Sequence, residues 1–219
     1  MILAEYLNID VSNDLLLRAL RTRICPFCAI LQTRTNELLC HLQLEAVQDE
    51  RVNTLVLSSG GYCHFHFWYL EKLASPVTNA RLLEQLLDTL TRRNFEDSVD
   101  LNAGAACPVC LSCRSWEETL VCFLADQLQD QDFRAAYEIS PGLCVPHLSA
   151  TAKKLPEEQR AFLVQAVRRQ LDAVIRDLRL LIEKWQNRNH TPGSESDASF
   201  RAIAKLIGGR HWQKWQTGG

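Results

Sequence analysis

A duplicated cysteine motif constrains this chain more than any other feature. Two short motifs each occur twice: CPxC, and about 35 residues later GxCxxH. The first copy holds Cys25, Cys28, Cys63 and His66, and the second copy holds Cys107, Cys110, Cys144 and His147. Cys107 follows Cys25 by 82 residues, and Cys144 follows Cys63 by 81 residues. Because order and spacing both recur, the sequence indicates an internal repeat built from two related modules.

These motifs have the residue types of a metal site. A CxxC motif brings two thiolates to one ion from a single turn, and a CxxH motif adds one thiolate and one imidazole nitrogen. We therefore predict one four-coordinate Cys3His site in each copy: Cys25, Cys28, Cys63 and His66 in the first, and Cys107, Cys110, Cys144 and His147 in the second. His64 competes with His66 for the first site. Val145 occupies the place of His64 in the second copy, which favours His66.

Gly61 and Gly142 precede the third cysteine of each copy by two residues. A backbone that turns back on a metal often needs a positive φ, which glycine adopts without strain. The glycines therefore fit the predicted sites.

The identity of the metal is a separate question. Thiolate-rich sets suit zinc or an iron–sulfur cluster. Cys40 and Cys122 recur twelve residues after the CPxC motifs. They either pack as small apolar residues in helices or give a cluster an additional thiolate. Since CxxC combined with CxxH is typical of closed structural zinc sites, we predict two Zn²⁺ per chain, with an iron–sulfur cluster as the alternative.

Two other uses of cysteine fit less well. CPFC by itself resembles a thioredoxin-type redox pair, but that motif follows a strand, whereas the residues before Cys25 have a helical pattern. Cys113 has no counterpart, because Leu31 occupies its place in the first copy. We expect Cys113 to pack in the core.

With these residues in view, the sequence resembles an uncharacterised bacterial family whose members carry CPxC followed some 35 residues later by GxCxxH, often twice, with a helical body. The resemblance runs from about Cys25 to the Gly208–Gly209 region. It implies the helical fold and the metal ligands, and it implies no particular activity.

The spacing of apolar residues predicts an all-α fold. Apolar residues three and four positions apart follow each CPxC motif, and no alternating apolar and polar run is present. We expect two tandem helical modules, each organised around a Cys3His site, then a long C-terminal helix and a short tail helix. Breaks at 97–106 and 191–197 give a first module over 1–98, a second module packed with it over 107–190, and a linker with an amphipathic tail over 191–219.

Composition limits the setting in which the protein works. The net charge of −2 gives no broad positive field, so nucleic-acid binding is only weakly supported and would need a local basic patch. The opening MILAEYLNID lacks a basic segment, and no run of 18 apolar residues could span a bilayer. We expect a cytoplasmic protein whose nine cysteines stay reduced, which favours metal binding over disulfides.

Two C-terminal segments are candidate surfaces for a partner. From Val164 to Trp185, apolar residues alternate at steps of three and four, a heptad seam that pairs either with a second chain or with residues 79–95. Beyond the linker lie an apolar face and a cationic set with two tryptophans: Phe200, Ile203, Ala204 and Ile207, with Arg201, Lys205, Arg210, Trp212, Lys214 and Trp215. Such a tail binds a protein, a nucleic acid or a membrane surface, or docks on its own domain.

No set of catalytic residues stands out in the sequence. A Ser-His-Asp set, a phosphate loop and a dinucleotide fingerprint are not recognised, and a closed metal site leaves no position for substrate. The sequence therefore favours a non-enzymatic structural or regulatory protein that binds metal and associates with a protein partner or with itself. The alternative is an iron–sulfur electron-transfer or thiol redox-sensing protein.

Overall fold

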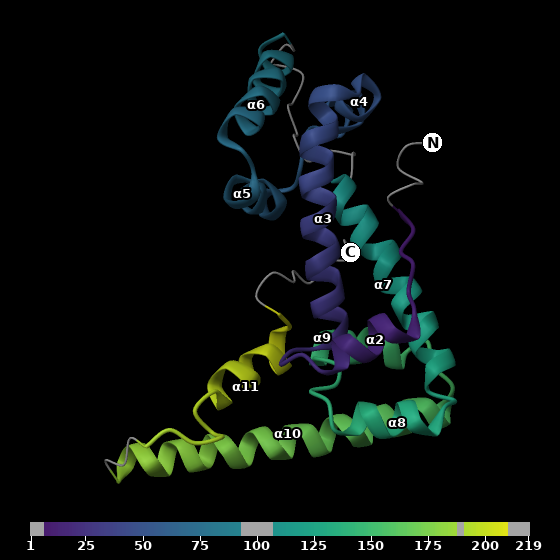
Figure 1. The fold of residues 1–219 in the computed structure, drawn as a ribbon, viewed down its shortest axis with the longest axis vertical. Coiled ribbons are helices and arrows are strands. Elements are labelled where there is room, and N and C mark those ends of the chain that lie inside the picture. Colours follow the sequence, from purple (N-terminus) through teal and green to yellow (C-terminus); the bar gives the residue numbers. More distant parts are fainter. Residues whose placement is uncertain (1–6, 93–106, 188–190, 210–219) are drawn as a thin grey trace. The chain divides into compact units, whose positions relative to one another are not determined.

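The computed structural model describes residues 7–92, 107–187 and 191–209. Within these ranges the chain forms ten helices and no strand, which confirms the predicted all-α class (Figure 1). The chain divides into two compact units. Unit 1 comprises residues 1–9 and 33–117, and unit 2 comprises residues 10–32 and 118–219. Each unit therefore contains residues from both sequence copies, in contrast to the boundaries expected from the order of the motifs.

Two long helices begin inside the CPxC motifs and pass from one unit into the other. They are α3 (Pro26–Gln48) and α7 (Pro108–Gln127). Unit 1 also contains α4 (Glu50–Ser58), α5 (His64–Leu73) and α6 (Pro76–Thr91). Unit 2 also contains α2 (Asn13–Leu20), α8 (Gln131–Glu138), α9 (Val145–Ala152), α10 (Glu157–Gln186) and α11 (Ala198–Ile207).

The helix order repeats between the two copies. In each copy a long helix is followed by a short helix, a helix that starts at the CxxH motif, and a helix that starts at or just after a proline. The short helices have the same kind of start: the carboxylates of Asp49 and Asp130 accept backbone N–H groups at the first turns of α4 and α8. This agreement in local structure supports the duplication predicted from the cysteines.

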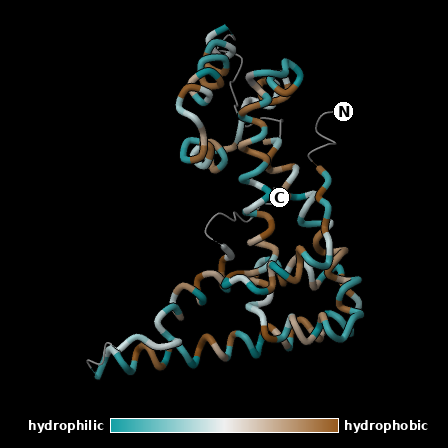
Figure 2. The backbone as a smooth tube through the Cα atoms, viewed as in Figure 1, coloured by the Kyte–Doolittle hydropathy of each residue, from teal (hydrophilic) through white to brown (hydrophobic). Residues whose placement is uncertain are grey.

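The predicted long C-terminal helix is α10, which has 30 residues and follows Pro156. Figure 2 shows hydrophobic and hydrophilic residues alternating along it. Its apolar stripe is buried at Leu163, Val167 and Val174, where α10 packs with α8, α9 and α11 of the same unit. Towards the end of α10 the stripe becomes exposed, and Trp185 is 67% exposed.

The short tail helix also forms, as α11, and it docks on α9 and α10. Two other parts of the predicted tail, Trp212 and Trp215, lie outside the described residues. None of the helices in the described ranges combines the length and the hydropathy needed to cross a bilayer.

Candidate metal centres

All eight predicted ligands lie in the first turn of a helix. The first cysteine of each CxxC or CxxH motif directly precedes its helix; these four residues are Cys25, Cys63, Cys107 and Cys144. Their carbonyls accept the first backbone hydrogen bonds of the helices, at 2.8 to 3.0 Å. The second ligand of each motif is the third helical residue. Side chains at the cap and at the third position face the same side of a helix N-terminus, so the CxxC and CxxH spacings each direct two donor atoms to one point.

The structure brings these eight residues together in two groups of four, but the groups combine the two sequence copies. The unit 1 group consists of Cys63, His66, Cys107 and Cys110, and the unit 2 group consists of Cys25, Cys28, Cys144 and His147. The prediction that each copy completes its own site is therefore wrong. Each CPxC motif meets the CxxH motif of the other copy.

The length of the long helices explains this exchange. The CPxC ligands lie at the start of α3, and a helix of 23 residues advances the chain by about 34 Å. The next helix, α4, has only nine residues, which rise about 14 Å and cannot bring the chain back. The CxxH motif that follows therefore belongs to a different unit from its own CPxC motif. The same holds for the second copy, where α7 has 20 residues and α8 has eight.

The unit 2 group has the dimensions of a site for a single ion. The His147 Nδ1 atom lies 3.4 Å from the sulfurs of Cys25 and Cys28 and 3.2 Å from that of Cys144. The sulfurs of Cys28 and Cys144 are 3.8 Å apart. Donor atoms about 2.0 to 2.3 Å from one tetrahedral ion are about 3.5 to 3.8 Å from each other. All four residues are buried, so this group can hold one metal ion away from solvent.

The unit 1 group repeats this geometry. The His66 Nδ1 atom lies 3.2 Å from the Cys63 sulfur and 3.5 Å from the sulfurs of Cys107 and Cys110. The Cys110 and Cys63 sulfurs are 3.5 Å apart. Three of the residues are buried, and Cys63 is partly exposed. His66 belongs to the group, whereas His64 is exposed and accepts a hydrogen bond from Trp68.

The groups also have the charge distribution that a cation requires. In the unit 2 group, burial opposes ionisation of Cys25, yet hydrogen bonds with Cys144 and Cys28 and the charge on His147 hold its pKa well below the ordinary value. Burial lowers the pKa of His147, but the charge on Cys25 together with hydrogen bonds to Cys144 and Cys25 outweighs burial and raises that pKa to about 10. In the unit 1 group, hydrogen bonds with Cys107 and Cys110 lower the pKa of Cys63.

Burial likewise lowers the pKa of His66, but hydrogen bonds with Cys107 and Cys63 outweigh it and raise that pKa to about 9. Hydrogen bonds with Cys144 and Cys25 raise the pKa of Cys28, and hydrogen bonds with Cys107 and Cys63 raise the pKa of Cys110. Without metal, each group therefore combines an imidazolium with one thiolate, from Cys25 or Cys63, and a cysteine that stays protonated. The N-termini of two helices point at each group, and their positive partial charges favour thiolates. A divalent cation that replaces these protons is bound by the deprotonated ligands.

Glycine at the turn before each CxxH motif is required, as predicted. Gly61 and Gly142 have φ values of 85° and 62°. A Cβ atom on Gly142 would lie 2.2 Å from the side-chain oxygen of Gln170. That oxygen accepts a hydrogen bond from Lys205, so both the positive φ and this contact favour glycine in the turn that delivers Cys144.

A buried lysine from the tail helix supports the unit 2 group. The Lys205 ammonium donates hydrogen bonds to the carbonyls of Pro141 and Leu143 and to Gln170, the last two at 2.9 and 2.8 Å. Lys205 is only 6% exposed. Burial lowers its pKa to about 8, while the charges on Cys25 and Cys144 act in the opposite direction. Lys205 is therefore cationic at neutral pH and lies within the field of the thiolates.

The sequence pattern predicted Lys205 on a cationic surface and did not reveal this buried role. Ala204 and Lys205 are adjacent buried residues on α11, flanked by exposed Ile203 and Leu206. A lysine next to small apolar residues in a strongly amphipathic helix is the sequence feature that could have indicated its burial. This signal is weak, because lysine at such a position usually extends its ammonium to water.

The remaining cysteines lie outside both groups. Cys40 and Cys122, which were candidates for additional ligands, are exposed on α3 and α7. Cys113 is buried, and its sulfur lies 3.2 Å from the Thr35 hydroxyl. Burial raises the pKa of the Cys113 thiol to about 12, and Cys113 belongs to neither group of four. All nine cysteines are free thiols.

No family model, curated protein or solved structure matches this chain. The resemblance to the bacterial CPxC and GxCxxH family is thus not confirmed by these comparisons. The assignment of two metal-binding groups depends on the geometry of the eight residues themselves.

Proposed function

We propose that this protein is a non-enzymatic structural or regulatory interaction protein whose two units are each held together by one zinc ion. One observation carries the proposal: in each group, three sulfurs and one imidazole nitrogen all lie within 4.8 Å of one another. This spacing matches four ligands on one tetrahedral ion and leaves no open coordination position. A site closed by four protein donors stabilises a fold and does not activate substrate.

The same spacing argues against the iron–sulfur alternative. A cluster places several irons and bridging sulfides between its ligands, so donors on different irons are farther apart than donors on a single ion. Cys40 and Cys122, the residues that could have completed a four-cysteine set, are exposed and belong to neither group. The nine free thiols support a reducing compartment such as the cytoplasm.

A structural role for the metal follows from the energies. Zinc bound by such sets contributes about 10 to 16 kcal/mol at neutral pH, which is comparable to the whole stability of an ordinary domain, about 5 to 15 kcal/mol. The unit 2 ion would join a CPxC helix to a CxxH helix much later in the sequence, since Cys144 follows Cys28 by 116 residues. In unit 1 the corresponding separation, from Cys63 to Cys110, is 47 residues. The metal therefore fixes the long-range topology of its unit.

The interaction role is supported by exposed apolar side chains on α10 and α11. Ile182, Trp185, Ile203, Leu206 and Ile207 are all more than half exposed and belong to unit 2. Several large apolar side chains on one unit are typical of a surface that contacts another protein. We propose a protein partner or a second copy of the chain as the occupant.

Metal analysis combined with double substitutions tests the metal assignment. Protein purified without oxygen should contain about two zinc ions per chain and be colourless. Cys25→Ser with Cys144→Ser should remove one ion, because both residues belong to the unit 2 group. Cys25→Ser with Cys63→Ser should remove both ions, because the two residues belong to different groups. Iron with labile sulfide and visible absorption bands would refute the zinc proposal.

A further inference from the structure

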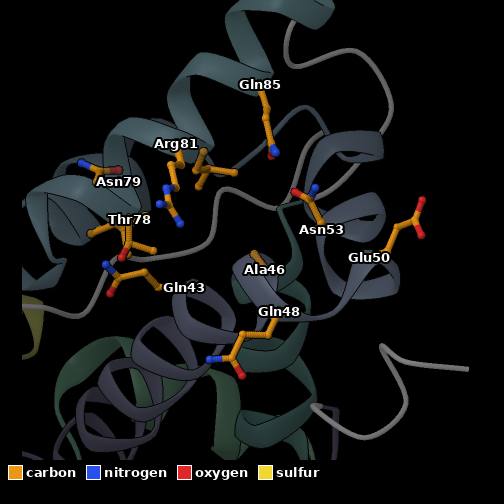
Figure 3. A pocket seen from close by; sticks show the side chains of 11 residues that line it. Gln43, Ala46, Gln48, Glu50, Asn53, Thr78, Asn79, Arg81 and Gln85 are labelled. Carbon is orange, nitrogen blue, oxygen red and sulfur yellow. The ribbon is translucent and has the colours of Figure 1, made fainter.

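Unit 1 contains a cavity of about 350 Å³ that none of the metal ligands lines. It is bounded by residues of α3, α4, α5 and α6 (Figure 3). Its volume is within the range of small-molecule sites, about 300 to 1,000 Å³. Five of its eleven lining residues carry amides, and one guanidinium, one carboxylate, one hydroxyl and three apolar side chains complete the wall, a composition that differs from an ordinary apolar packing defect.

Two buried polar atoms in this wall lack partners within the described chain. They are the side-chain nitrogen of Gln43 and the side-chain oxygen of Asn53. Gln43 is only 7% exposed. A buried amide without a hydrogen bond is costly, so native proteins pair such groups with protein, water or ligand. One donor and one acceptor are therefore available in the same cavity.

Arg81 and Thr78 stand at the Gln43 end of the wall, whereas the carboxylate of Glu50, near Asn53, points away from the other lining side chains (Figure 3). In Figure 3, Arg81 and Thr78 from α6 lie near Gln43 from α3. Arg81 forms no ion pair with any residue in the described ranges. Guanidinium, hydroxyl and amide N–H groups are all donors, and an arginine binds a planar carboxylate through two parallel hydrogen bonds.

The other end of the cavity offers an acceptor. Figure 3 shows Gln85 from α6 and Asn53 from α4 pointing toward each other. The Asn53 oxygen nevertheless has no hydrogen-bond partner, so a group that donates a hydrogen bond fits between these two amides. A ligand that satisfies both ends carries a carboxylate at one end and an N–H or O–H donor at the other.

We propose that this cavity is a binding site for a small organic acid that bears an amide, amino or hydroxyl donor several bonds from its carboxylate. Arg81, Thr78 and Gln43 bind the carboxylate, and Asn53 and Gln85 bind the far group. Occupancy joins α6 to α3 and α4, so ligand binding stabilises this part of unit 1. The site is independent of the proposed metal function, because it shares no residue with either ligand group.

Three acyclic compounds of equal chain length test this site on the metal-loaded full chain. Glutaramate has a carboxylate and an amide, pentanoate has only the carboxylate, and pentanamide has only the amide. Ligand-observed NMR titration gives their dissociation constants. Glutaramate should bind most tightly, since only glutaramate satisfies both ends of the cavity. No saturable binding of glutaramate at millimolar concentration would overturn the proposal and leave water as the occupant.

Substitutions then locate the binding. Arg81→Met should weaken glutaramate and pentanoate by about tenfold or more, because a charged hydrogen bond is lost, and should leave pentanamide unchanged. Asn53→Leu should reduce glutaramate to the affinity of pentanoate. Arg92→Met is the matched control, because Arg92 follows α6, pairs with Asp88 and does not line the cavity.

Arg81 is exposed, so its substitution should preserve the fold, and circular dichroism and metal content verify this in every variant. Binding that is unchanged in Arg81→Met would refute the site. Metal content is measured on the same samples, so a failure of the zinc proposal is recognised separately.

Discussion

The two metal-binding groups have the same types of ligand, each at the N-terminus of a helix, but their surroundings differ. In the unit 2 group all four residues are buried, and Lys205 from α11 donates hydrogen bonds to the turn that carries Cys144. In the unit 1 group Cys63 is partly exposed. Three thiolates and one neutral imidazole around Zn²⁺ carry one net negative charge. Water can solvate that charge in unit 1, whereas a buried cation must balance it in unit 2.

This difference shows how duplicated motifs can keep one donor set while the two groups that they form acquire different electrostatic environments. The two groups also differ in which CPxC motif and which CxxH motif they join. Because each group joins a CPxC motif of one copy to a CxxH motif of the other, damage to one motif should be felt in the opposite copy of the sequence and within the same compact unit.

The largest expected effect tests this exchange. Replacing Cys144 with Ser should release one ion and destabilise unit 2 by several kcal/mol, because a three-ligand site loses most of the metal's contribution. Amide hydrogen exchange should therefore increase at residues 25–32, in the first sequence copy. Replacing Cys63 with Ser should increase exchange at residues 107–113 instead. If exchange instead increased at residues 25–32 in Cys63→Ser, the result would support one site within each sequence copy and contradict the exchanged groups.

A second prediction concerns pH and applies to both groups. The imidazoles of His147 and His66 have pKa values of about 10 and about 9 without metal, so at pH 8 and below a metal ion must displace a proton from each. Zinc affinity should therefore fall by about tenfold or more for each pH unit of acidification. Competition titration with a chromophoric chelator at pH 8 and pH 6 measures this, and a pH-independent affinity would contradict the ligand assignment.

In the metal-free protein, the contribution of the histidines to folding stability should decrease as pH rises, whereas zinc affinity increases with pH. A histidine whose folded pKa lies above the unfolded value of about 6.5 contributes stability below pH 6.5 and loses it as pH rises through 9 to 10. Cys25 and Cys63, whose folded pKa values are lowered, act in the opposite direction. Denaturant unfolding of the chelated protein between pH 6 and 10, compared with a variant that carries His66→Gln and His147→Gln, therefore isolates the histidine contribution.

Replacing Lys205 with Met should affect one group only. The substitution removes the cation next to the buried thiolates, and loss of a charged hydrogen bond corresponds to about a tenfold change. Zinc release to excess chelator should show two phases, and the slower phase, from the buried unit 2 group, should become about tenfold faster. The Cys63→Ser variant assigns the phases, since it retains only the unit 2 group.

Lys154→Met is the matched control for this experiment, because Lys154 pairs with Glu118 at an exposed site of the same unit. Equal acceleration in both lysine variants would mean that the effect is general destabilisation. Removal of residues 199–219 should act like Lys205→Met and still leave two ions bound.

The smallest effects are expected at the cysteines outside the groups. Cys40→Ser and Cys122→Ser should retain both ions and change the free energy of unfolding by about 0.5 kcal/mol or less, because both side chains are exposed. Alkylation with iodoacetamide followed by mass spectrometry should label these two residues first in the metal-loaded protein. Loss of an ion in either variant would show that the substituted cysteine, Cys40 or Cys122, is a metal ligand.

The sequence by itself determined the local parts of this protein. Helical periodicity predicted the all-α fold, Pro156 located the start of α10, and the CxxC and CxxH spacings identified the eight residues that meet in the two groups. These features depend on residues within one or two helical turns of each other. For that reason a single sequence is sufficient to recognise them.

Tertiary structure decided which motifs meet. Nothing in a CPxC motif specifies its CxxH partner, and the structure assigns the CPxC motif and the CxxH motif of each copy to different units. Burial of Lys205 beside the thiolates and the meeting of Gln43, Asn53 and Arg81 at one cavity likewise depend on contacts between distant segments. Such contacts follow from packing in three dimensions, so periodicity and motif spacing could not reveal them.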